Sequence, residues 1–149
     1  MLGVDLSLRA STPTFILEPK YSGGNNALDA AVLEKLRAKY ILIPVCPESD
    51  GGLSTPRDPS ERVGDTVLSR YGQNVTAEFA RGAEIALERA VSEGCKKALM
   101  KELSPSCGSG RIYDGTFTGT VVDGYGLAAE LLKNNGVEVF GEGKIEKLL

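Results

Sequence analysis

Three short apolar runs, each preceded by a helical pattern, constrain the fold of this chain most strongly. The runs are residues 40–45, 97–100 and 137–140. Apolar residues at helical spacing predict helices from residue 25 or 26 to 39, from 76 to about 93, and from 125 or 126 to 135. Strands that alternate with helices predict an α/β fold: a three-layer, mostly parallel sheet with flanking helices, Rossmann-like, in a single small domain. This domain is expected to span residues 1–149, with an atypical N-terminal segment at 1–20.

Two long loops follow two of these predicted strands, and each loop carries one cysteine. The loops are residues 46–59, with Cys46, and 103–124, with Cys107. Parallel strands end at one edge of a sheet, where ligands of such folds bind. Two cysteines at this edge favour a shared site, and a soft thiolate pair suits zinc, Cu(I) or an iron–sulfur cluster. The alternative is that each is a buried structural thiol.

The composition excludes several function classes. The chain has no His, which removes Ser-His-Asp and Cys-His catalysis and leaves proton transfer to a carboxylate, Lys, Tyr, Cys or water. A net charge of −3 argues against nucleic-acid binding, which needs a basic surface. No apolar run is long enough to cross a membrane. Three cysteines without a secretory signal predict a reducing, cytoplasmic location.

The two cysteine loops carry long and unusual motifs. PVCPESDGGLSTPRDPSE (residues 44–61) and KELSPSCGSGRIYDGTFTG (residues 101–119) resemble the two signature segments of the thiouracil desulfurase-like family. The resemblance extends over about residues 20–140. It implies a small α/β domain that holds a 4Fe–4S cluster through three cysteines and leaves one iron open to sulfur. The implied reaction is non-redox: water replaces the sulfur of a thiolated pyrimidine such as 2-thiouracil, giving uracil and sulfide.

The resemblance also assigns roles to residues of both motifs. By their positions, Cys46 and Cys107 match two cluster ligands, Glu48 matches the acid beside the cluster, and Ser104 or Ser106 matches the catalytic hydroxyl. An open iron would polarise a thiocarbonyl as a Lewis acid. Glu48, next to apolar strand ends, is expected to carry the proton that water must lose.

Polar residues around the motifs are candidates for contact with a flat heterocyclic substrate. They are Tyr21, Ser22, Gly23, Arg57, Gly108, Tyr113 and Asp114. Arg57 suits a carboxylate, a phosphate or a ring oxygen, with a loop salt bridge as the equal alternative. The Gly108 N–H is a candidate anion donor. For Asp114 a turn role, and for Tyr113 a packing role, remain the alternatives.

The N-terminal segment departs from the family pattern. The family begins with a strand and a Ser-x-Cys-Leu-x-Gly segment whose cysteine is the first cluster ligand, whereas residues 1–4 match only the end of that segment. Residues 6–20 resemble an insertion, and the first strand would be lost. The exposed sheet edge would then be filled by residues 14–18 or by a partner chain in a homodimer. Cys95 is expected to point into the core, away from the site. The alternatives to the enzyme are a cluster-free module that binds small anions or nucleobases, and a truncated, inactive family member.

Overall fold

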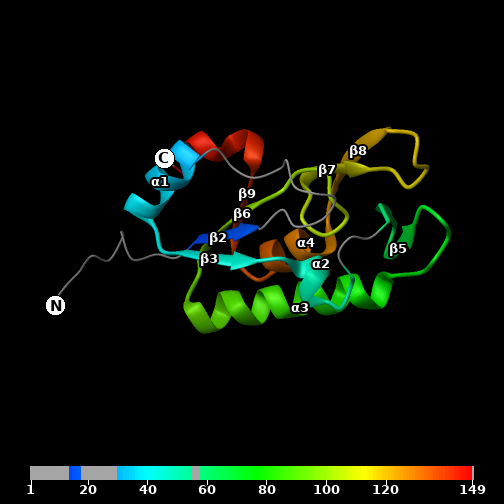
Figure 1. Cartoon of the computed structure of the whole chain (residues 1–149), viewed down its shortest axis with the longest axis horizontal. Helices are drawn as coiled ribbons and strands as arrows, with labels where there is room; N and C mark the ends of the chain where they lie inside the picture. Colours follow the sequence, from blue (N-terminus) through cyan, green and yellow to red (C-terminus); the bar gives the residue numbers. More distant parts are fainter. Residues whose placement is uncertain (1–13, 18–29, 55–57, 149) are drawn as a thin grey trace.

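A four-stranded parallel sheet forms the centre of the described structure (Figure 1). The computed structural model describes residues 14–17, 30–54 and 58–148. The strands are β2 (Thr14–Leu17), β3 (Leu42–Val45), β6 (Lys97–Met100) and β9 (Glu138–Gly141), in the order β3-β2-β6-β9. Each neighbouring pair is parallel. This confirms the predicted α/β fold and the three predicted strands.

The β2 strand lies inside the sheet and not at its edge. Thr14 is in register with Leu42 of β3 on one side and with Lys97 of β6 on the other. The expectation that residues 14–18 supply a strand is therefore correct, but the place expected for that strand is corrected. A central strand gives the backbone groups of both neighbours their partners. The described sheet thus has no gap at this position for a partner chain to fill.

Helices cover both faces of the sheet. Helices α3 (Thr76–Glu93) and α4 (Leu127–Asn134) pack on one face, while α1 (Ala30–Lys39) and the 3₁₀ helix η2 (Glu142–Lys147) lie on the other (Figure 1). Successive side chains of β6 point to opposite faces of the sheet. Ala98 and Met100 pack in a first core with α3 and α4, and Leu99 packs in a second core on the other face. The second core also holds Leu36 and Tyr40. No helix in the described ranges is long and apolar enough to span a membrane.

The loop after β3 contains a one-turn helix that the sequence did not predict. Helix α2 (Pro47–Asp50) begins with a proline, whose fixed backbone suits the first helical position. It packs on α3 at Gly82, where an added Cβ would collide with the Pro47 carbonyl. The contact between α2 and α3 therefore requires a residue without a side chain at this point.

Two hairpins extend from the end of the sheet where β3 and β6 finish (Figure 1). The first pairs β4 (Ser60–Val63) with β5 (Thr66–Ser69) around a turn at Gly64, and a second turn at residues 70–72 brings Asn74 back against Leu68. The second pairs β7 (Ser109–Tyr113) with β8 (Val121–Tyr125). Residues 103–124 had been expected to form a loop, and that expectation was wrong. Despite the many glycines, the β-forming residues at 112–113 pair in register with those at 121–122.

Candidate active site

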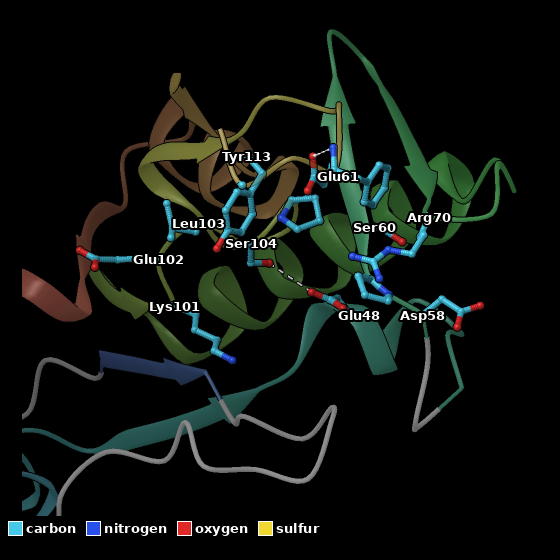
Figure 2. A pocket seen from close by; sticks show the side chains of 14 residues that line it. Glu48, Asp58, Ser60, Glu61, Arg70, Lys101, Glu102, Leu103, Ser104 and Tyr113 are labelled. Carbon is cyan, nitrogen blue, oxygen red and sulfur yellow. Dashed lines mark hydrogen bonds between the residues drawn. The ribbon is translucent and has the colours of Figure 1, made fainter. Parts of the chain in front are cut away.

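The edge of the sheet brings the two cysteine motifs together. Cys46 directly follows β3, and Glu48 lies in α2 just beyond it. The loop after β6 places Ser104 opposite, and its hydroxyl donates to the Glu48 carboxylate at 3.1 Å between Oγ and Oε2. Figure 2 shows the two side chains pointing toward each other. Residues 56 positions apart in the chain thus share one hydrogen bond at the predicted edge.

The Ser104 hydroxyl is fixed by its surroundings. Its oxygen accepts the N–H groups of Ser106, at 3.0 Å, and Cys107, at 3.2 Å. The residue is buried, with 7% of its surface exposed. A hydroxyl has two lone pairs and one proton, so these two bonds leave the proton for Glu48. Ser104 therefore holds both the cysteine loop and the carboxylate.

The Cys107 thiol lies in the core of the molecule, next to this carboxylate. Only 1% of the residue is exposed, and burial raises the pKa of its thiol well above the ordinary value. The charges of Glu48 and Cys46 raise this pKa further, and the charge of Lys101 lowers it. Burial is the largest cause, so the environment favours the protonated thiol.

Cys46 is the more accessible of the two thiols. It is half-buried, and its thiol donates to the Ser49 hydroxyl at 3.4 Å. Its backbone N–H points to the Asp50 carboxylate, also at 3.4 Å. The short helix thus folds back over the cysteine that precedes it, and the thiol stays at the surface of the site.

Cys95 is at the opposite edge of the sheet. It precedes β6, whereas Cys46 and Cys107 follow their strands. The residue is 5% exposed within the core formed with α3 and α4, and burial raises the pKa of its thiol to about 11. This confirms the prediction that Cys95 points into the core. Cys95 is too far along the strand to join the other two at one metal site.

The donors at the sheet edge do not make up a complete cluster site. Three thiolates are implied by the resemblance, and the described edge supplies two, from Cys46 and Cys107. Within the described ranges, no group of three or more Cys, Asp or Glu side chains is placed to hold a metal ion. Two thiolates match the chemistry of an iron–sulfur site, but they do not fill it.

A cavity of about 600 Å³ opens beside the Glu48–Ser104 pair. This volume is in the range of small-molecule sites. The sheet edge forms one side of it and the two hairpins form the other (Figure 2). Its charged lining residues carry both signs: Glu48, Asp58, Glu61, Arg70, Lys101 and Glu102. The cavity can therefore bind a polar molecule, with hydrogen-bond donors and acceptors on facing walls.

Of the predicted substrate contacts, Tyr113 lines this cavity. Asp114 is at the turn after β7 and is not part of this cavity; its carboxylate accepts the N–H and the hydroxyl of Thr116, and the hydroxyl bond lowers its pKa. The turn role is the correct one for Asp114. Tyr21, Ser22, Gly23 and Arg57 lie outside the described residues.

The expected anion contact at Gly108 is also corrected. Its N–H donates to the Ser104 carbonyl at 2.8 Å, so the donor is used inside the cysteine loop. Ser106, the second candidate hydroxyl, is fully buried, and its carbonyl accepts N–H groups at the start of α4. Between the two serines, the structure favours Ser104 as the hydroxyl of the site.

Five charged lining residues were missed by the sequence reasoning. They are Asp58, Glu61, Arg70, Lys101 and Glu102. Lys101 is 8% exposed and comes directly after β6. A charged residue at the end of an apolar strand could have indicated it as a site residue. Glu61 and Arg70 depend on the first hairpin, and no local pattern marks them.

Comparisons with known proteins identify the family of the chain. The model of the 2-thiouracil desulfurase family matches residues 15–144. The uncharacterized protein YbbK of Bacillus subtilis (strain 168) is 36% identical over 143 residues, covering 89% of this chain and 93% of that protein. The solved structure of the 4Fe–4S-dependent thiouracil desulfidase TudS is 40% identical, covers 93% of this chain and 95% of that one, and superimposes with a TM-score of 0.84. The chain belongs to the 2-thiouracil desulfurase family.

Proposed function

We propose that this protein removes sulfur from a thiolated pyrimidine, or a related thiolated heterocycle, by non-redox hydrolysis. Water adds its oxygen to the carbon, the C=S bond becomes C=O, and the sulfur leaves as hydrogen sulfide. No electron is exchanged, so the reaction needs only proton transfer and a site for the sulfur. The observation that carries the proposal is the Ser104–Glu48 hydrogen bond at the cavity, between two cysteines, in a chain of this family.

Glu48 is the proposed general base. Its carboxylate lines the cavity, is half-buried, and is oriented by the Ser104 hydroxyl. A carboxylate within hydrogen-bond reach of a bound water can take the proton that the water loses and return it to the departing sulfide. Ser104 keeps the carboxylate in place, and its own position is set by the two N–H groups it accepts.

Cys46 and Cys107 are the proposed protein ligands of an iron–sulfur cluster. The name of the solved relative states that it depends on a 4Fe–4S cluster. In this chain the two thiols lie at the same sheet edge as Glu48, and soft thiolates are the usual ligands of such clusters. A third ligand would come from outside the described donor set.

The remaining expectations extend this proposal. We propose one domain for the whole chain and the reducing cytoplasm as its compartment, where the cysteines stay free of disulfides. A thiolated pyrimidine is the proposed partner, and nucleic acid is not. The homodimer expected from the N-terminal segment stays a prediction.

The test is a desulfidation assay on protein reconstituted anaerobically with iron and sulfide. We expect 2-thiouracil to give uracil and sulfide in equal amounts. Glu48→Gln should retain its iron and lower kcat about 100-fold, which is the usual size of a general-base effect. Glu84→Gln, an exposed change on α3, is the matched control and should leave kcat unchanged. An unchanged kcat in Glu48→Gln would remove Glu48 from the mechanism.

One observation favours a second function. The described edge carries two thiols and not three, yet the cavity is fully formed. A cluster-free protein could use the same cavity to bind an anion or a nucleobase. Reconstituted protein that retains no iron but binds uracil would support this alternative.

A further inference from the structure

The tip of the β7–β8 hairpin holds an aromatic side chain in a strained conformation at the cavity. Phe117 lines the cavity together with Tyr113, and its φ is +58°. A positive φ is a genuine outlier for a bulky residue, and it persists only where surrounding contacts offset the strain. Strained residues of this kind cluster at active sites and at ligand-binding contacts.

A buried carboxylate holds this conformation. Glu61, on β4, is 8% exposed, and its Oε1 accepts the N–H of Gly115 at 2.9 Å and the N–H of Phe117 at 3.1 Å. These charge-assisted bonds connect one hairpin to the tip of the other. They also fix the backbone on both sides of Thr116. Both bonds therefore support the positive φ of Phe117.

Arg70 adds a second contact to the Phe117 ring. Its guanidinium carbon lies 5.9 Å from the ring centroid, within the range of a cation–π contact. Arg70 is exposed and also lines the cavity. The half-buried Phe117 ring therefore has Arg70 as one neighbour and the open cavity as another.

The hairpin residues face the chemistry across the cavity. Glu48 and Ser104 come from the sheet edge, whereas Glu61, Arg70 and Phe117 come from the hairpins. We propose that Phe117 stacks on the flat ring of the substrate and that Glu61 is the positioning residue that holds Phe117 there. This inference rests on the proposed function, because it takes a planar thiolated heterocycle as the molecule that enters the cavity.

Uracil, the expected product, is the probe for the stacking contact. Its Kd is measured by titration calorimetry on the reconstituted protein, and the KM for 2-thiouracil is measured alongside. Loss of a base–aromatic stack weakens binding about tenfold or more, so Phe117→Leu and Phe117→Ala should raise Kd and KM by that factor. Phe117→Tyr should retain the affinity. Tyr71→Leu removes an exposed aromatic that does not line the cavity, and it should change neither constant.

The positioning role of Glu61 is tested by a pair of variants. Glu61→Ala should raise the Kd of uracil about tenfold and speed hydrogen exchange at the Gly115 and Phe117 amides. Glu61→Gln keeps a carbonyl acceptor and should restore the affinity. A purely structural role would lower the unfolding temperature of both variants and leave the Kd of the folded protein unchanged.

The outcomes separate this inference from the proposed function. An unchanged Kd in folded Phe117→Leu overturns the inference, whether or not the wild type is active. Wild-type protein that binds no uracil also overturns it. Wild-type protein that binds uracil through Phe117 but releases no sulfide from 2-thiouracil supports the inference and contradicts the proposed reaction.

Discussion

The two walls of the cavity are built in different ways. At the sheet edge, Ser104 and Cys107 are 7% and 1% exposed and are fixed by hydrogen bonds within one short loop. At the hairpins, Arg70 is exposed, and Phe117 is held by contacts with Glu61 and Arg70 of the other hairpin. The rigid edge suits groups that must meet at defined distances. The hairpin wall suits residues that shape the cavity around a ligand.

This difference predicts different consequences for changes on the two walls. Substitutions at the edge should alter cofactor binding and turnover, because the reacting groups lie there. Substitutions at the hairpins, such as those at Phe117 and Glu61, should alter affinity and leave the iron content unchanged. A hairpin variant that lost its iron would show that the two walls do not have separate roles.

The largest effect is expected for Cys107→Ser. Removal of this thiol takes away one of the two cysteines at the edge, so we expect loss of all bound iron and of activity. Iron and acid-labile sulfide per chain are measured after anaerobic reconstitution. Cys95→Ser, at the opposite edge of the sheet, is the matched control and should keep both. If Cys95→Ser lost its iron instead, the assignment of the thiols would be wrong.

A large effect on stability is expected at Gly126, which supports the edge. An added Cβ would collide with the Ser106 carbonyl and lie 2.5 Å from the Cys107 nitrogen. Gly126→Ala should therefore lower the free energy of unfolding by about 1–3 kcal/mol, the usual cost of overpacking. It should also displace the cysteine loop and lower the iron content.

Gly72→Ala provides the control for Gly126. Gly72 has a φ of +85° and no atom within 4 Å of an added Cβ, so the change introduces backbone strain without a collision. Both variants are measured by urea unfolding and by iron content. Only Gly126→Ala should lose iron, and equal iron contents in the two variants would contradict the role of Gly126.

The smallest effect is expected at alkaline pH and concerns Cys95, away from both walls. Burial raises the pKa of this thiol from 9.0 to about 11. The folded protein then keeps a proton that the unfolded chain loses, so the stabilisation is complete below pH 9 and is lost as the pH rises toward 11. One proton changes the slope by at most about 1.4 kcal/mol per pH unit. The free energy of unfolding of Cys95→Ser should fall less steeply than that of the wild type, and equal slopes would contradict the burial of the thiol.

Local patterns in the sequence were sufficient for three strands of the sheet and for the edge that carries the site. Helix α3 and strand β6 follow from apolar periodicity, and the meeting of Glu48 with Ser104 follows from the rule that parallel strands end at one edge. The motifs that resemble the family named the same residues. Here the local pattern and the tertiary structure agree.

The hairpin wall could not be predicted in this way. The contact between Glu61 and the Phe117 N–H spans 56 positions in the chain, and no local pattern indicates it. The glycines of residues 108–124 favoured a loop, whereas the pairing of Ile112 with Val122 formed a hairpin. The sequence also did not indicate that β2 is an interior strand, because four residues are too few to show a strand's place in a sheet.

A crystal structure of the protein with bound uracil would show directly where the pyrimidine ring binds. We expect the ring to lie in the cavity between the Glu48–Ser104 pair and the Phe117 side chain. A second cavity of about 500 Å³, lined by residues including Arg62, Asp123 and Lys133, provides the contrast. Uracil bound in that second cavity, or Phe117 turned away from the ligand, would contradict the account.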